Sequence, residues 1–340
     1  MDFFNTQIRE LIVENIEIDR NFQYEQFKVG RSNITFKIFD DKNSYVLRRP
    51  PYGNKLESAH NMSREYKIID ELSKNNLKVP KPIFLYTEKD ITEDDFYIME
   101  YVEGKTISDN IEAKLLSSDE KQTISNSFIE TIADIHNFDV VNSKLNDLGK
   151  YEGYVERQLN RWTKQFEAQK VREIEDLDFA TEMLFQNIPK QQKISIVHGD
   201  YRLDNVRVNN GKVAAVVDWE LCTIGDPLAD LGTIIASWSN SKEKDTPFIY
   251  SPTLSDGFLS RSELLEIYSN NSDLDLKNIE FYVRLSYWKH AMIMEGVYVR
   301  YSRGSYGKIN KKEIELFKQS TVMFAKKAAN QDLLKEIKWK

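Results

Sequence analysis

The order of apolar and polar residues changes character at about residue 104. Before that point, residues 34–39 alternate between apolar and polar side chains, which is typical of a strand with one buried face. A turn at 40–43 and a returning stretch at 44–49 predict an antiparallel hairpin. The other elements expected in this part are a helix at about 59–74 and strands at about 82–87 and 95–102.

Beyond Gly104 the apolar residues recur at helical spacing, interrupted by short strands expected around 194–217. Asp226 followed by Pro227 predicts a further helix start, because the two residues suit the cap and the first turn of a helix. The pattern predicts helices at about 118–138, 151–169, 172–187, 261–269, 276–300 and 311–330. The chain therefore divides into a strand-rich part, 1–103, and a helix-rich part, 104–340, which indicates an α+β fold.

Composition excludes several classes of protein. A hydrophobic content of 41% and a charged content of 30% over 340 residues describe an ordinary globular chain. The formal charge of -7 argues against a nucleic-acid partner, which would need a broad basic excess. The single cysteine, Cys222, excludes an internal disulfide framework and a cysteine zinc cluster.

The order of residues also gives an expectation for the cellular location of the protein. The first five residues lack the basic and apolar stretches of a signal peptide, and no run of about 18 apolar residues occurs. We therefore expect neither a leader nor a membrane span, and a cytoplasmic location. Oligomeric state is left open by the sequence.

The densest chemistry lies between residues 198 and 218. Asp200 is followed five residues later by Asn205, and Asp218 ends the apolar run 213–217. Asp200 is the candidate general base or orienting group for a hydroxyl, while Asn205 and Asp218 offer the oxygen ligands that Mg²⁺ prefers. This order and spacing serve phosphoryl transfer from ATP in protein-kinase-like folds. The alternative is a polar turn between two strands, with Asp and Asn present only for turn geometry.

Two stretches carry a resemblance to a known family. They read V-H-G-D-Y-R-L-D-N-V-R from residue 197 and D-W-E-L-C-T-I-G-D-P-L-A-D-L from residue 218. The wording resembles the aminoglycoside phosphotransferase and choline kinase family, and most closely the phosphotransferase domains fused to some acyl-CoA dehydrogenases. The resemblance implies a two-lobed protein-kinase-like fold, with an N-lobe at 1–103, a C-lobe at 104–340 and a nucleotide cleft between them. It also implies ATP and Mg²⁺ as cofactors.

The resemblance assigns roles in the first part of the chain. Gly30, Ser32 and Asn33 would contact phosphate, although only one glycine is present and a plain hairpin fits equally well. Arg48 stands where protein kinases have a lysine, and Arg can clamp two phosphate oxygens. The adjacent Arg49 leaves this choice open, since neighbouring strand residues point to opposite faces.

Further assignments complete the expected nucleotide site. Glu65 would pair with the cation, as a helix glutamate does in kinases, although a solvated helix face explains a glutamate equally well. The stretch ending at Gly104 would connect the lobes, with backbone groups of Glu100 and Val102 on the adenine and Met99 lining its pocket. His198, Asp226 and Asp230 are interpreted as scaffold, and Glu220 stays open between metal, substrate and neither.

The acceptor is the least determined feature. Arg157, Arg161 and Lys164 share a helical face, which favours an anionic acceptor over a cationic one. The expected function is transfer of the γ-phosphate of ATP to a hydroxyl of a small molecule, an anionic hydroxy acid or acyl derivative. The alternatives are an aminoglycoside or amino-alcohol kinase and a non-catalytic nucleotide-binding pseudokinase. Further basic residues are Arg284, Lys289, His290, Arg300 and Arg303, and an opposing acidic stretch holds Glu173, Glu175, Asp176, Asp178 and Glu182.

Overall fold

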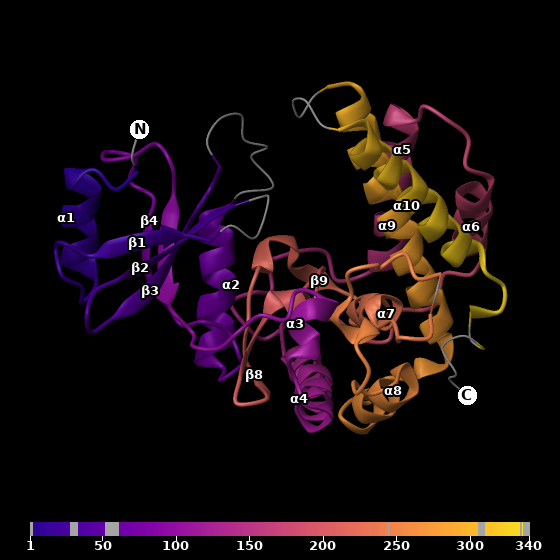
Figure 1. Cartoon of the computed structure of the whole chain (residues 1–340), viewed down its shortest axis with the longest axis horizontal. Helices are drawn as coiled ribbons and strands as arrows, with labels where there is room; N and C mark the ends of the chain where they lie inside the picture. Colours follow the sequence, from indigo (N-terminus) through magenta and orange to yellow (C-terminus); the bar gives the residue numbers. More distant parts are fainter. Residues whose placement is uncertain are drawn as a thin grey trace. The chain divides into compact units, whose positions relative to one another are not determined.

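The computed structural model divides the chain into two compact units, which are described separately (Figure 1). The structure describes residues 3–27, 33–51, 61–243, 245–304, 310–333 and 335. Unit 1 comprises Met1–Lys105, Ser143–Leu145 and Asn205–Cys222. Unit 2 comprises Thr106–Asn142, Asn146–Asp204 and Thr223–Lys340. Unit 1 thus takes in residues 104–105 and two further segments from the part of the sequence that was assigned to the C-lobe.

Unit 1 is built on a five-stranded antiparallel sheet in the order β1-β2-β3-β5-β4. Its strands are β1 (Gln23–Gln26), β2 (Ile34–Phe39), β3 (Ser44–Arg49), β4 (Pro82–Tyr86) and β5 (Phe96–Glu100). Two helices accompany it, α1 (Thr6–Asn15) and α2 (Met62–Lys74), together with the hairpin β7 (Val206–Asn209) and β8 (Lys212–Val216). The hairpin turns at Asn210 and Gly211, both at positive φ, which matches the twist of a two-residue hairpin turn.

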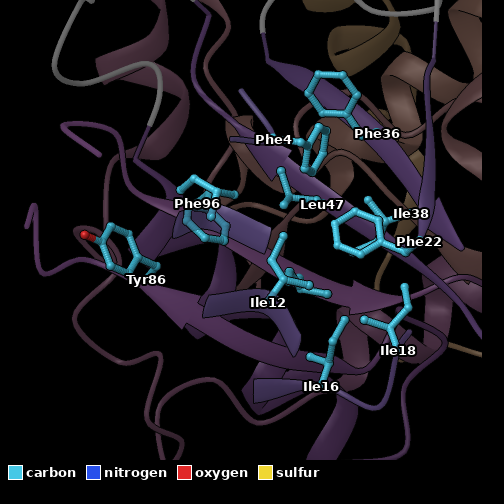
Figure 2. Packing of buried hydrophobic residues seen from close by; sticks show 12 residues of the cluster. Phe4, Ile12, Ile16, Ile18, Phe22, Phe36, Ile38, Leu47, Tyr86 and Phe96 are labelled. Carbon is cyan, nitrogen blue, oxygen red and sulfur yellow. The ribbon is translucent and has the colours of Figure 1, made fainter. Parts of the chain in front are cut away.

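Strand alternation gives each face of this sheet its own partner. Phe36, Ile38 and Leu47 point toward α1 and pack with Ile12 and Phe96 in the hydrophobic cluster shown in Figure 2. The neighbouring residues Arg48 and Tyr97 point the other way, where their polar atoms reach α2. One face of the sheet is therefore a hydrophobic core and the other carries charge.

Unit 2 is mostly helical. Its helices are α3 (Asn110–Lys114), α4 (Ser118–Asn137), α5 (Tyr154–Gln169), α6 (Glu175–Gln186), α7 (Leu228–Ser237), α8 (Arg261–Asn270), α9 (Ile279–Ser302) and α10 (Lys311–Ala329). A short antiparallel pair, β6 (Ser195–Val197) and β9 (Thr223–Gly225), lies on either side of the segment 198–222 in the sequence. In the part of the chain that the structure describes, no helix is both long and apolar enough to cross a membrane.

The elements expected from the sequence are largely confirmed. The hairpin of β2 and β3 has the predicted bounds. Four helices begin later than expected, at Met62, Tyr154, Glu175 and Ile279. The reason is visible at α2 and α5, where Asn61 caps the helix with its side chain and Gly153 adopts a left-handed conformation. Helix α1 and strand β1 were not predicted, because α1 buries only Ile8 and Ile12 and all four residues of β1 are exposed.

Gly232 makes the contact between α7 and α9 possible. A Cβ atom at this position would overlap the backbone of Tyr282, which cannot move without shifting α9. We expect Gly232→Ala to lower the free energy of unfolding by about 2–3 kcal/mol, because overpacking outweighs the gain in helix propensity. Denaturant unfolding of both proteins would measure this.

Gly296→Ala in α9 is the matched control. A Cβ there would meet only the ends of flexible side chains, Gln169 Nε2 at 3.0 Å and Arg300 Nη1 at 3.2 Å. This variant should unfold at the wild-type free energy or slightly above it. Equal stability of the two variants would show that α7 and α9 are not held at the distance described.

Candidate active site

Arg48 is the centre of a charged cluster in unit 1. It lies near the end of β3, and its side chain is 10% exposed. Its Nε atom is 3.0 Å from Glu65 Oε2, and an Nη2 atom is 2.5 Å from Asp218 Oδ1 and 3.5 Å from Glu220 Oε2. One guanidinium therefore faces three carboxylates that come from α2 and from the segment after β8.

Two neutral side chains complete this Arg48 cluster. The amide of Asn33 donates hydrogen bonds to Glu65 Oε1 at 3.0 Å and to Glu220 Oε2 at 3.1 Å. The hydroxyl of Tyr97 donates to Glu65 Oε2 at 3.1 Å. Glu65 is thus held by Asn33, Arg48 and Tyr97 at once, and its position in the cluster is fixed from three directions.

Burial shifts the titration of the cluster. It raises the pKa of Glu65 to about 7, although the guanidinium of Arg48 acts in the opposite direction. Burial also opposes the charge on Arg48, but the carboxylate of Glu65 and then Tyr97 and Asp218 outweigh it, so the pKa of Arg48 rises. Arg48 therefore stays charged, and the cluster as a whole carries more acid than base.

Arg48 and Arg49 point to opposite faces of the sheet. Arg49 Nη2 donates a hydrogen bond to Asp94, and its guanidinium lies 4.4 Å from the ring centroid of Phe3. Arg48 reaches the helix glutamate that the sequence singles out. The register explains this, because Arg48 is the cross-strand partner of Tyr97, whose hydroxyl also bonds Glu65.

The two expected magnesium ligands lie at the base of the β7–β8 hairpin. The backbone N–H of Val217 donates to the carbonyl of Asn205 at 3.0 Å, which brings Asn205 beside the residue that precedes Asp218. Asp218 has a left-handed backbone, φ 66° and ψ 64°, which costs energy for a residue with a Cβ atom. Its side chain stays 32% exposed, so one carboxylate of the cluster is open to solvent.

A divalent cation fits this donor set. Asn205 and Asp218 supply an amide and a carboxylate oxygen, and the surplus negative charge around Arg48 favours a cation over an anion. Among the residues in the described ranges, no group of three or more His, Cys, Asp or Glu is arranged to hold a metal unaided. These residues would therefore hold a metal that brings other ligands with it, as Mg²⁺ does on a nucleotide.

The structure describes three of the other five residues that are expected to contact the nucleotide. Gly30 and Ser32 lie outside the described residues. Met99 is buried in β5, the N–H of Glu100 donates to the carbonyl of Lys81 at 2.9 Å, and the carbonyl of Val102 accepts from Arg207 Nε at 3.4 Å. An adenine contact at Val102 would thus use its N–H group.

In unit 2, Asp230 anchors the segment that contains Asp200. Its carboxylate accepts the backbone N–H groups of His198 at 2.6 Å and Gly199 at 2.9 Å. His136 Nε2 lies 3.3 Å from the same carboxylate, and His136 Nδ1 lies 2.8 Å from the hydroxyl of Tyr268. Asp230 is therefore a positioning residue, as the sequence indicated, and His198 is buried beside it.

The carboxylate of Asp200 is reachable and paired. Its side chain is 31% exposed, and Arg202 Nε lies 3.0 Å from Asp200 Oδ1. The same guanidinium lies 3.0 Å from Asp204 Oδ2, so Arg202 bridges two carboxylates. The backbone N–H of Asp200 donates to His198 Nδ1 at 3.3 Å, which orients the loop from its buried side.

Lys289 on α9 approaches the same loop. Its Nζ donates to the carbonyl of Gly199 at 3.5 Å, and it lines a small cavity together with Gly199 and Trp162 of α5. Burial lowers the pKa of Lys289, and the carboxylates of Asp200 and Asp230 offset part of this effect. Lys289 is thus a cation close to the proposed base.

Two of the basic residues expected near the acceptor have structural partners instead. Arg284 is buried and bonds the carbonyls of Ala328 and Asn330 and the carboxylate of Glu280, so it belongs to the packing of α10. Arg157 bonds the carbonyl of Lys150. In the acidic stretch, Lys170 Nζ lies 2.7 Å from Glu173 Oε2 and 3.8 Å from Asp178 Oδ1.

Sequence reasoning missed Tyr97, Arg202 and Trp162. Tyr97 could have been found from strand alternation, since it lies two residues before Met99 and shares its face. Arg202 lies two residues from both Asp200 and Asp204, and this spacing was the available signal. Nothing in the sequence places Trp162 beside Gly199, because only the packing of α5 on α9 brings them together.

Comparison with known proteins places this arrangement among characterised folds. Residues 23–249 match the sequence profile described as the phosphotransferase enzyme family. A human protein, acyl-CoA dehydrogenase family member 11, is 35% identical over 289 residues, which cover 82% of this chain and 36% of that protein. The chain thus spans about a third of the length of the curated relatives it matches.

Two solved structures show the same fold. A Ralstonia eutropha protein with a provisional assignment as an aminoglycoside phosphotransferase has a TM-score of 0.81 and 29% identity, covering 96% of this chain and 98% of that one. The aminoglycoside phosphotransferase APH(4)-Ia with AMP-PNP and hygromycin B has a TM-score of 0.63 and 14% identity, covering 94% and 98%. The expected resemblance and the kinase-like α+β fold class are confirmed.

The raised pKa of Glu65 predicts a pH-dependent stability. The folded value of about 7 lies above the ordinary value, so the native state holds this proton more tightly than the unfolded chain does. Its contribution to stability is complete below about pH 4.5 and is lost as the pH rises through about 7. Between these values, the free energy of unfolding of the wild type should fall by about 2–3 kcal/mol relative to that of Glu65→Gln.

Urea titrations at several pH values would measure this difference. Glu14→Gln changes an exposed glutamate of α1 and is the matched control, for which the difference from wild type should stay constant. A Glu65→Gln curve parallel to the wild-type curve between pH 4.5 and 7.5 would contradict the assignment.

Proposed function

The chain belongs to the phosphotransferase enzyme family, and from this premise we propose that it transfers the γ-phosphoryl group of ATP to a hydroxyl of a small molecule. The observation that supports this most is the Arg48 cluster, in which a buried cation, a helix glutamate and the carboxylate of Asp218 meet. Protein kinases use the same three kinds of group around ATP. A buried ion-pair cluster often stabilises a fold no more than hydrophobic residues of similar volume would, so stability alone does not explain this arrangement.

The residues of unit 1 would bind the nucleotide. Arg48 would contact phosphate oxygens, with Glu65 and Tyr97 fixing its reach. Asn205 and Asp218 would hold Mg²⁺, and Met99, Glu100 and Val102 would contact the adenine. The metal ion, when bound, neutralises charge on the β- and γ-phosphates. Gly30, Ser32 and Asn33 remain the proposed phosphate loop.

Asp200 in unit 2 would act on the acceptor. The acceptor oxygen forms a bond to the γ-phosphorus of ATP, and the bond from that phosphorus to the β–γ bridging oxygen breaks, so that this oxygen leaves with ADP. The hydroxyl proton passes to the carboxylate of Asp200. Arg202 orients that carboxylate, and Asp230 holds the loop through two backbone N–H groups. Because the phosphoryl group is transferred in line, these groups contribute position more than covalent chemistry.

We propose an anionic hydroxy acid or acyl derivative as the acceptor. Lys289 and Arg202 are cations close to Asp200, and they would offset the charge of a carboxylate brought to it. The names of the human relative and of its counterparts in other animals refer to acyl-CoA dehydrogenases, whose substrates carry acyl groups. An acceptor with an acyl or carboxylate end is consistent with both observations.

An aminoglycoside or amino-alcohol acceptor is the second candidate. It is favoured by the structural neighbour that holds hygromycin B and by the carboxylate of Asp204, which with Asp200 could receive a cation. A pseudokinase is disfavoured because Asp200, Asn205 and Asp218 are all present.

Asp200→Asn tests the assignment of the base. We expect phosphate transfer to fall by at least about 10³-fold, because the variant cannot take the proton or hold the hydroxyl as a carboxylate does. Binding of Mg·ATP should be largely retained. Transfer would be followed over a panel of hydroxy acids, kanamycin, choline and sugars, and nucleotide binding by calorimetry.

Asp176→Asn, which alters an exposed carboxylate of α6, is the control and should keep full activity. Undiminished transfer in Asp200→Asn would remove Asp200 as the base. Nucleotide binding by the wild type without transfer to any acceptor would favour the pseudokinase.

A further inference from the structure

We propose that Lys289 and Trp162 form a subsite for an oxyanion of the acceptor, in the cavity where α5 and α9 meet the backbone of Gly199. This subsite would select hydroxylated acceptors that carry a carboxylate or a similar group near the hydroxyl. The inference rests on the proposed function, because the acceptor must present its hydroxyl to Asp200, which follows Gly199 in the chain.

The cavity is small and lies within unit 2. Its lining includes Tyr154, Gln158 and Trp162 of α5, Gly199, and Ser286 and Lys289 of α9. Its volume of about 20 Å³ is enough for one water-sized group, since a water needs roughly 10–15 Å³ measured in this way. It would therefore admit one end of a ligand, such as a carboxylate oxygen, and not the ring of an aminocyclitol.

Two residues of the lining, Trp162 and Lys289, carry N–H donors with spare hydrogen-bonding capacity. The indole N–H of Trp162 is buried and has no hydrogen-bond partner among the residues that the structure describes. Lys289 has three N–H groups, and over the same described ranges its only hydrogen bond is the long one to Gly199, at 3.5 Å. A buried donor without an acceptor costs free energy, which a ligand oxygen would relieve.

The acidic group in the lining does not compete for these donors. Asp230 directs its two carboxylate oxygens at the backbone N–H groups of His198 and Gly199, and His136 approaches the same group. The carboxylate of Asp230 therefore holds the loop at His198 and Gly199 in place. The cavity keeps a positive character, because Arg161 also lies 5.4 Å from the ring of Trp162 and Lys289 lies 6.0 Å from the same ring.

The lowered pKa of Lys289 is consistent with a binding site for an anion. Burial lowers the pKa of its ammonium group, with Asp200 and Asp230 acting against this shift and Arg161 adding to it. A bound oxyanion at the cavity would stabilise the charged form. The ammonium group of Lys289 would then offset the negative charge of the acceptor, which would otherwise be repelled by the nearby carboxylate of Asp200.

The test uses the full chain and matched acceptors that differ only in charge. These are 3-hydroxybutyrate with 3-hydroxybutyramide, and glycerate with glyceramide, together with kanamycin and choline. We expect the wild type to prefer each carboxylate over its amide by at least roughly 30-fold in kcat/KM. Lys289→Met should raise KM for the carboxylates by a similar factor and reduce this preference to near one, while Lys289→Arg restores part of it.

Trp162→Phe should raise KM for the carboxylates by about tenfold, because it removes one N–H donor and keeps the ring. Lys326→Met removes an exposed positive charge from α10 and should leave the preference unchanged. Thermal melting of each variant would identify a folding defect, and the preference of the wild type tests the idea even if Lys289→Met does not fold.

Failure of the inference can be told apart from failure of the proposed function. Transfer to the amides, to choline or to kanamycin as efficient as transfer to the carboxylates would overturn the subsite and leave the kinase assignment standing. The same holds for a carboxylate preference that survives in Lys289→Met. If the wild type transferred phosphate to no acceptor at all, the kinase assignment would fail and the subsite with it.

Discussion

The burial of one positive charge shapes unit 1. Arg48 sits at the end of a strand whose other face belongs to a hydrophobic core, and a buried guanidinium must be neutralised by nearby acids. Glu65 from α2 and Asp218 from the segment after β8 provide these acids. The ion pairs therefore join the sheet, a helix and the β7–β8 hairpin at one point. Glu220 also lies near Arg48, so the carboxylates outnumber the cation. The resulting negative charge favours binding of a metal ion.

A second polar arrangement serves unit 2 in a different way. Asp230 is buried on α7 and uses its charge to hold two consecutive backbone N–H groups of the loop before Asp200. The loop is thereby fixed from its buried side, while Asp200 stays partly exposed and paired to Arg202. Fixing the backbone and leaving the carboxylate accessible is what a residue that must meet a substrate hydroxyl requires.

Much of this could be predicted from the sequence because local patterns carry it. The alternation of residues 34–49 gave a hairpin with the observed bounds, and the spacing of Asp200, Asn205 and Asp218 indicated phosphoryl transfer before any geometry was known. The pairing of Arg48 with Glu65 was also expected. The choice between Arg48 and Arg49 was not, because it depends on which face of the sheet receives α2.

What the sequence could not predict depends on contacts between distant segments. Strand β1 has no buried residue, so its pairing with β2 leaves no periodic signal. Arg284 was grouped with Lys289 by its position in α9, yet it turns toward the end of α10 while Lys289 turns toward Gly199. Helical spacing gives the face of a helix, and only tertiary packing decides what that face meets.

Calorimetric titration of the wild-type protein with AMP-PNP, with and without Mg²⁺, tests the central claim most directly. A cluster with more carboxylates than cations repels the free triphosphate, so removing Mg²⁺ should weaken binding by at least about tenfold, or roughly 1.4 kcal/mol. Equal affinity in the presence of EDTA would contradict the claim that the carboxylates around Arg48 receive a metal-bound nucleotide.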